Sequence, residues 1–294
     1  MGKFVQLIVD GLSTGSIYGA IALAIVLVHQ ATGLINFAQG GMAVLAAYVA
    51  WWLTTTRGVP LILAILLSIL FSFALGAVVE RGLMRRFERG DPDTAVVVTI
   101  GLLTLITGLC GWLWTYNNQQ FPSLFSLRTV SVLGVHISIR SIGTTLVIVV
   151  AMLLLQGLFV GTKLGLALRA VAINPQSSAF SGLPVGRLLM VGWGLAAALG
   201  AVAGALVAPQ LTLTPGMLDT ALVYALAAVI LGGLTSPVGV VVAAWIIGIL
   251  ENLAAVYISF IGFDLKVAVP FILIFVVLMI RPQGLFGRKS VVRV

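Results

Sequence analysis

Polar side chains that stand inside long apolar runs are the residues of this 294-residue chain that could do chemistry. Glu251 and Asn252 lie together in the apolar run 238–258. An ionisable group in such a run is costly to bury, which makes it a candidate for binding an ion or a substrate. The alternative is a hydrogen-bonded structural pair between helices, and the sequence leaves both interpretations open.

A second polar pair, Asn36 and Gln39, lies one helical turn apart in the glycine-bracketed stretch 32–41. The glycines predict a broken helix, whose free N–H and C=O groups would face a cavity, as they do at substrate sites in transporters. Capping of a helix end at the membrane interface is the alternative. Asp10 and Glu80 stand at the ends of apolar runs, and we expect both to be interfacial.

The third polar feature is an island, residues 161–183, between two apolar runs that are each long enough to cross a bilayer. Residues 164–172 are rich in helix formers, and Arg169 projects from them. Asn174 and Pro175 then break the helix. The pattern predicts a short amphipathic helix that lies along one membrane face and presents a binding surface for another protein.

Motifs for chemistry within the chain itself are missing from the sequence. It has no phosphate-binding G-x-x-x-x-G-K-S/T and no H-E-x-x-H. His29 and His136 are far apart in sequence, and the single cysteine, Cys110, excludes an intrachain disulfide and a cysteine metal site. We therefore expect no enzyme activity, no metal and no cofactor in this chain.

The composition indicates which kind of secondary structure must hold these polar groups in place. Hydrophobic residues make up 61% of the chain and charged residues 8%, and the mean hydropathy is +1.19. A soluble domain carries about 25% charged residues, so this is a polytopic membrane protein. Its backbone must be satisfied internally in lipid, which requires helices. The net charge of +8 comes from short basic clusters between apolar runs, the pattern of membrane loops rather than of a nucleic-acid surface.

We predict an all-α polytopic membrane protein that forms one domain over residues 1–294. It should have about eight or nine transmembrane helices, with one or more broken or re-entrant segments and a short cytoplasmic helix in the island. The run 218–231 is short for a full crossing and is the candidate half-span. Small residues at every fourth position predict one closely packed helix face; they are Gly192, Ala196, Gly200 and Gly204.

The orientation follows from the basic residues. They gather in the loop 81–89, in the island with the residues after it (161–187) and in the tail 281–293, and the positive-inside rule makes all three cytoplasmic. The C-terminus is then cytoplasmic. The loop 117–140 faces outside, as does the N-terminus, and the alternating residues 130–139 predict a small hairpin in that loop.

Several segments, taken in order, resemble the inner-membrane permease subunits of branched-chain amino acid ABC transporters. They are residues 33–40, Glu80-Arg81 with residues 99–101, residues 165–174, residues 231–239 and residues 281–287. The resemblance covers essentially the whole chain. It implies a permease that forms half of the translocation pathway for branched-chain or hydrophobic amino acids and works by alternating access.

The resemblance also implies partners. They are a second permease subunit, related to this chain rather than a copy of it, two cytosolic ABC ATPases that bind Mg-ATP, and an extracytoplasmic substrate-binding protein. The location would be the cytoplasmic (inner) membrane of a bacterium or archaeon. The positions that match the family's ATPase-coupling helix are Leu168, Arg169, Ala170, Asn174, Ala179 and Gly182. The candidates for the pathway are Asn36, Gln39, Glu251 and Asn252.

Two alternatives remain at this point. The same architecture would also suit import of urea or short amides, because the interior holds few fixed charges. A stand-alone secondary transporter or channel would instead use Glu251, or one of the carboxylates Asp10 and Glu80, as its ion site.

Overall fold

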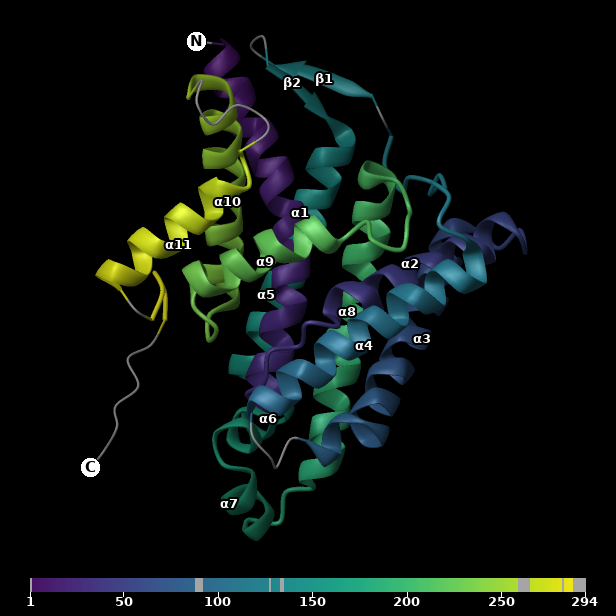
Figure 1. Cartoon of the computed structure of the whole chain (residues 1–294), viewed down its shortest axis with the longest axis vertical. Helices are drawn as coiled ribbons and strands as arrows, with labels where there is room; N and C mark the ends of the chain where they lie inside the picture. Colours follow the sequence, from purple (N-terminus) through teal and green to yellow (C-terminus); the bar gives the residue numbers. More distant parts are fainter. Residues whose placement is uncertain are drawn as a thin grey trace. The chain divides into compact units, whose positions relative to one another are not determined.

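The computed structural model describes residues 2–87, 92–126, 128–132, 135–258, 265–281 and 283–287 (Figure 1). Its helices are α1 (Gly2–Thr32), α2 (Gln39–Thr55), α3 (Leu61–Gly82), η1 (Met84–Arg86, a 3-10 turn), α4 (Pro92–Trp114), α5 (Ile139–Gly161), α6 (Lys163–Ile173), α7 (Pro175–Phe180), α8 (Val185–Leu211), α9 (Asp219–Gly232), α10 (Pro237–Tyr257) and α11 (Ala268–Ile280). The basic residues Arg89, Arg288, Lys289 and Arg293 lie outside the described residues.

The all-α polytopic class is confirmed. Within the described residues, six helices are long and apolar enough to cross a membrane, namely α1, α3, α4, α5, α8 and α10. α9 and α11 are apolar but have only 14 and 13 residues, whereas a full crossing needs about 20. α9 coincides with the run that was expected to be too short. The predicted hairpin also forms, as β1 (Thr129–Val132) antiparallel to β2 (Val135–Ser138).

Packing groups the chain into two compact units, each made of separate segments. Unit 1 comprises Met1–Val26, Phe125–Leu153 and Leu222–Val294. Unit 2 comprises Leu27–Leu124 and Leu154–Ala221. Helices α1, α5 and α9 each contribute residues to both units, so neither unit corresponds to one continuous stretch of sequence.

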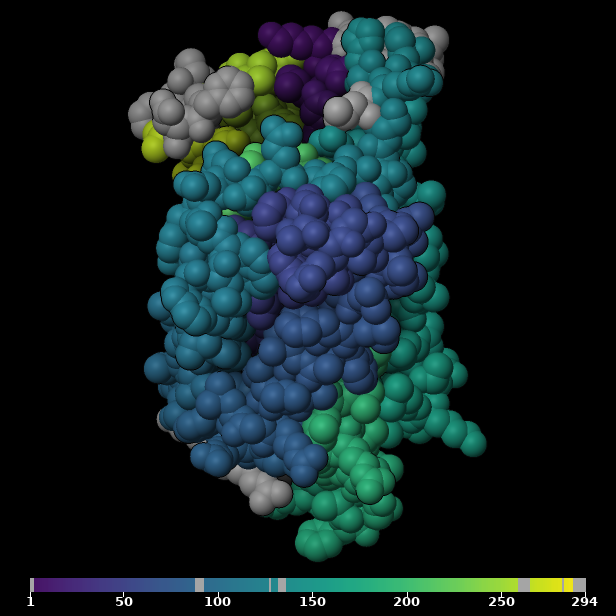
Figure 2. Space-filling view, turned by 90° about the vertical axis from the view of Figure 1, so that its right-hand side faces the viewer, coloured from purple at the N-terminus to yellow at the C-terminus, as the bar shows by residue number. Residues whose placement is uncertain are grey.

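Unit 2 is built on close contacts of α8 with α2 and α3. Gly76 of α3 lies so near α8 that an added Cβ would stand 2.5 Å from the Trp193 carbonyl oxygen. An added Cβ at Gly204 would overlap the carbonyl group of Ala43 in α2. Small residues thus let the backbones approach directly. Figure 2 shows one face of the molecule, on which the blue atoms of α3 border the green atoms of α8.

Unit 1 uses glycines in the same way where α1 crosses α10. An added Cβ at Gly11 would stand 2.5 Å from the Ile249 Cα. The buried hydroxyl of Ser16 then ties three helices together. It lies 2.9 Å from the Thr145 hydroxyl of α5 and accepts a 3.0 Å hydrogen bond from the Trp245 indole of α10.

Glu80 lies in the last turn of α3, at the end of the apolar run as expected, but its side chain is buried inside the protein. Its side chain is 0% exposed, at the end of α3. The η1 turn folds the chain back so that Arg85 donates to both carboxylate oxygens, from Nε at 3.0 Å and from Nη2 at 2.8 Å. Arg85 also donates to the Gly186 carbonyl at 2.8 Å, which fastens the start of α8 to α3. Asp10 is exposed.

Candidate functional site

The polar island folds into two short helices, α6 and α7, because two side chains cap them. The Thr162 hydroxyl accepts a 3.0 Å hydrogen bond from the Gly165 N–H and begins α6. The Asn174 carboxamide oxygen accepts a 2.9 Å bond from the Ser177 N–H, and Pro175 fills the first turn of α7. Such caps satisfy N–H groups that have no partner inside the helix. The sequence predicted α6 and the break, but not α7.

The inner face of α6 is anchored in unit 2. Leu168 and Val171 are fully buried in a hydrophobic cluster that also contains Ala31 of α1, Phe159 of α5 and Trp193 of α8. Leu168, one of the positions matched to the coupling helix, therefore holds α6 against the unit rather than offering surface to a partner. A displacement of α6 must displace the packing of α1, α5 and α8 with it.

The outer face of α6 and α7, which we call the island surface, is exposed and carries large apolar side chains next to polar ones in the sequence. Phe180 is 92% exposed and Ile173 is 85% exposed. Ala179 and Gly182 are exposed beside them, as is Asn174. Side chains of this kind can take part in a contact with another protein or with a membrane.

Arg169 and Ala170 lie at the side of α6 and are half-buried. The Arg169 Nε is shielded from solvent, and in the described part of the chain it has no hydrogen-bond partner. A buried guanidinium N–H without an acceptor is costly, and an acceptor brought by another molecule would remove that cost.

The glycine-bracketed stretch is a true break between α1 and α2. Gly33 has φ +78°, and helical structure resumes at Gln39. The Asn36 carboxamide oxygen accepts from the Ala38 N–H at 2.9 Å, and its NH₂ donates to the Gln39 carboxamide oxygen at 3.3 Å. Gln39 donates in turn to the Ala196 carbonyl of α8 at 2.9 Å. Asn36 and Gln39 are both buried, so their carboxamides stabilise the break between α1 and α2. That either side chain lines the translocation pathway remains a prediction.

Glu251 is the centre of a buried polar cluster in unit 1. Its side chain is 1% exposed, and both of its oxygens are engaged. The Tyr18 hydroxyl of α1 donates at 2.9 Å and the Tyr224 hydroxyl of α9 at 3.2 Å. The two tyrosine rings are stacked, with centroids 4.5 Å apart and planes at 4°. Lys266 Nζ lies 3.3 Å from Oε1. The carboxylate therefore joins α1, α9, α10 and the segment before α11.

Sequence reasoning missed the partners of Glu251. It considered a pair with Asn252, but Asn252 is half-buried on the same helix and the bonds run to Tyr18 and Tyr224 instead. Lys266 carried a signal, because it is a lone cation at the start of an apolar run. With Lys266 at 3.3 Å, the carboxylate already holds a counter-ion. Within the described residues, no group of His, Cys, Asp and Glu is arranged to hold a metal ion.

The tail folds back on the break between α9 and α10. The Leu285 N–H donates to the Leu231 carbonyl at 2.7 Å, and the Phe286 N–H donates to the Gly232 carbonyl at 3.2 Å. The last carbonyls of a helix have no partner inside it, so the tail caps α9. Gly284 permits the approach, because its φ is +78° and an added Cβ would stand 2.7 Å from the Ile230 carbonyl oxygen.

Comparisons with known proteins agree on one family. Residues 7–278 match the family model described as branched-chain amino acid transport system / permease component. The chain is 30% identical to the high-affinity branched-chain amino acid transport system permease protein BraD of Pseudomonas aeruginosa, over 99% of this chain and 98% of that protein. It is 27% identical to the permease protein LivH of Escherichia coli K12, with the same two coverages.

Among solved structures, the chain was matched to PsaBC from Streptococcus pneumoniae in complex with Fab. The match has a TM-score of 0.46 and 18% sequence identity, and it covers 95% of this chain and 92% of that chain.

Proposed function

Because the chain belongs to the family of branched-chain amino acid transport permeases, we propose that it forms half of the translocation pathway of an ATP-driven importer. Its cargo would be a branched-chain or other hydrophobic amino acid. The second half would come from a related permease subunit. A substrate-binding protein would deliver the amino acid from the outer side of a bacterial or archaeal inner membrane, and two cytosolic ATPases would bind and hydrolyse Mg-ATP.

The observation that carries the proposal is the island surface. It exposes the apolar side chains of Ile173 and Phe180, and α6 also carries Arg169, whose Nε has no described acceptor. An acidic groove on an ATPase would cover the apolar residues and supply that acceptor. The chain has no phosphate-binding loop of its own, so ATP-driven work would have to enter through such a contact.

The anchoring of α6 suggests how the work is transmitted. When the ATPases close on ATP, the docked α6 and α7 would move with them. Leu168 and Val171 are embedded in the cluster shared with α1, α5 and α8, so these helices would rock together. Alternating access then means that the pathway between the two permease subunits opens first to one side of the membrane and then to the other.

A charge reversal at Arg169 tests the contact. We expect Arg169→Glu to weaken ATPase binding by about thirtyfold, because a like charge at an interface costs about 2 kcal/mol or more. The measurements are co-purification of the ATPase and uptake of labelled leucine into vesicles that carry the full assembly. Arg187→Glu is the matched control, since Arg187 is an exposed arginine at the end of the same loop. Leucine uptake by an Arg169→Glu subunit that binds no ATPase would refute the proposal.

The cargo is tested in the same vesicles. We expect unlabelled leucine and isoleucine to compete with labelled leucine, and urea and short amides to have no effect. Competition by urea or acetamide would favour the alternative cargo. The stand-alone transporter alternative instead predicts leucine uptake without an ATPase, which the uptake measurement on the Arg169→Glu subunit also tests.

A further inference from the structure

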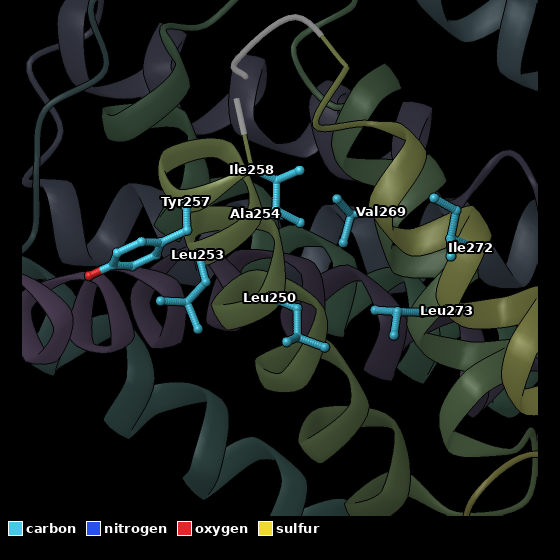
Figure 3. Close-up of a pocket in the computed structure, with 8 residues that line it drawn as sticks. All are labelled: Leu250, Leu253, Ala254, Tyr257, Ile258, Val269, Ile272 and Leu273. Atoms are coloured by element: carbon cyan, nitrogen blue, oxygen red, sulfur yellow. The ribbon is translucent and has the colours of Figure 1, made fainter. Parts of the chain in front are cut away.

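The same two segments of unit 1 carry an ion pair and the walls of an apolar groove, and the import mechanism above uses neither. The ion pair joins Glu251 of α10 to Lys266, two residues before α11. The groove, here called the α10–α11 groove, has a volume of about 390 Å³. Figure 3 shows its two walls facing each other, with Leu250, Leu253 and Ala254 on α10 and Val269, Ile272 and Leu273 on α11.

Both charged residues stand within one helical turn of residues that line the groove. Glu251 is adjacent to Leu250 and one helical turn before Ala254. Lys266 is one turn before Val269, whose N–H donates to the Lys266 carbonyl at 3.2 Å. The same two segments therefore carry a negative group, a positive group and an apolar wall. Ligand sites of this size are typically apolar with a few polar groups that fix orientation.

The two charges differ in how firmly they are held. The Glu251 carboxylate is 1% exposed and is fixed by hydroxyl donors on two other helices, Tyr18 and Tyr224. Lys266 is 44% exposed and reaches the carboxylate on a flexible four-carbon chain. One end of the pair is thus a rigid anion, while the other is a cation that can move without leaving solvent contact.

We propose that the Glu251–Lys266 pair and the α10–α11 groove form a binding site for the zwitterion of an aliphatic amino acid. The α-ammonium of the ligand replaces the Lys266 ammonium on the Glu251 carboxylate, Lys266 turns to the α-carboxylate, and the aliphatic side chain lies in the groove. This inference rests on the proposed import function, for which it names the substrate contacts within this subunit.

The exchange conserves every charge contact. One ammonium replaces another on Glu251, and Lys266 gains the carboxylate that the ligand brings. An amine without a carboxylate would displace Lys266 and leave it unpaired, and a carboxylate without an ammonium would take Lys266 and leave Glu251 buried without a counter-ion. The site therefore selects zwitterions, and its apolar wall favours aliphatic side chains over polar ones.

Uptake by the full assembly, at a saturating concentration of its binding protein, provides the first test. We expect Lys266→Met and Glu251→Gln to lower the maximal rate of leucine uptake by about tenfold or more, because each removes one charged hydrogen bond to the ligand. Both replacements keep the approximate side-chain volume, and in Glu251→Gln the carboxamide oxygen can accept from one tyrosine hydroxyl while the NH₂ can donate to the oxygen of the other. Lys3→Met, at another exposed lysine of unit 1, should stay within about twofold of wild type.

Ligand preference separates binding from a merely structural role. The measurement is the thermal stability of the permease–ATPase assembly in nanodiscs without the binding protein. Leucine should raise the Tm of the wild type, whereas 3-methylbutylamine and 4-methylpentanoate, which lack the carboxylate and the ammonium respectively, should not. In Lys266→Met, 3-methylbutylamine should stabilise as well as leucine does. In Glu251→Gln, 4-methylpentanoate should do so. A structural ion pair would lower every Tm and leave the preference unchanged.

The groove is tested by side-chain size. Ala254→Leu narrows it, and we expect leucine uptake to fall about tenfold relative to alanine uptake. If a lipid chain alone occupies the groove, this ratio will not change, and the proposal is wrong. Leucine uptake at the wild-type rate by both Lys266→Met and Glu251→Gln would also overturn it. Absence of amino acid uptake by the wild-type assembly would instead refute the proposed function itself.

Discussion

Two buried carboxylates, Glu80 and Glu251, show how single residues hold the described parts of this chain together. Glu80 is paired with an arginine five residues away, which donates a hydrogen bond to each carboxylate oxygen and another to a carbonyl at the start of α8. Glu251 is matched by a lysine from a separate segment and by two tyrosine hydroxyls. The first arrangement is local and rigid, which suits a structural joint. The second has one mobile member, and the exchange of ligands proposed above depends on that mobility.

The Glu80 joint leads to a prediction about stability. Arg85→Met removes the counter-ion of a carboxylate that is 0% exposed, so we expect the free energy of unfolding to fall by about 3 kcal/mol. Arg81→Met removes the same charge from an exposed position next to Glu80. This control should change the free energy of unfolding by less than about 0.5 kcal/mol. Denaturant titration of the purified subunit measures both. Equal losses in the two variants would show that the joint contributes nothing beyond its net charge.

At the scale of elements, glycines set how closely the helices pack. Gly76 admits the α8 backbone directly, and any larger residue must push α3 and α8 apart. We expect Gly76→Val to lower the free energy of unfolding by about 3 kcal/mol and to reduce the yield of assembled subunit. Gly101→Val is the control, because Gly101 of α4 has open space at its Cβ position. A loss in Gly101→Val as large as in Gly76→Val would assign the effect to helix propensity instead of packing.

The tail is an element that acts through its backbone. Its hydrogen bonds to Leu231 and Gly232 cap α9, and Gly284 makes the approach possible. We expect Gly284→Ala to speed hydrogen exchange at the Leu285 and Phe286 amides by at least about tenfold, because strain and a backbone clash both oppose docking. Mass spectrometry of the C-terminal peptide measures the rates.

Gly58→Ala gives the matched control for the tail. Gly58 has φ +67° with nothing within 4 Å of an added Cβ, so alanine there brings strain without a clash. Its variant should leave exchange in the C-terminal peptide unchanged. Slow exchange in Gly284→Ala would show that the tail is held by other contacts.

At the scale of the whole molecule, the sequence predicted what depends on local pattern. Apolar runs gave the helices, the helix formers before Asn174-Pro175 gave α6, and the glycines around Asn36 gave the break between α1 and α2. It did not predict contacts that join distant segments. Tyr18 and Glu251 are 233 residues apart, and only the crossing of α1 and α10 at their glycines brings them together. Burial of Glu80 was missed for a similar reason, because it depends on the fold-back at η1.

Orientation in the membrane is the remaining property of the whole molecule, and the basic loops predict it. If they face the cytoplasm, α7 lies on that side and the β1–β2 hairpin lies outside. Exposed cysteines introduced at Phe180 in α7 and Thr129 in β1 report the two sides in a Cys110→Ala background, since Cys110 is buried. We expect an impermeant maleimide to label Thr129→Cys in intact cells, and Phe180→Cys only in inside-out vesicles.

The same labels connect orientation with coupling. If α7 is the ATPase contact, bound ATPase should slow labelling of Phe180→Cys in inside-out vesicles by about tenfold or more, because Phe180 would lie inside the interface. Labelling of Thr129→Cys in intact cells should not depend on the ATPase, which cannot reach the outer face. Labelling of both cysteines from one side would contradict the orientation. If bound ATPase does not slow the labelling of Phe180→Cys, the orientation still holds, but the coupling contact lies elsewhere on the chain.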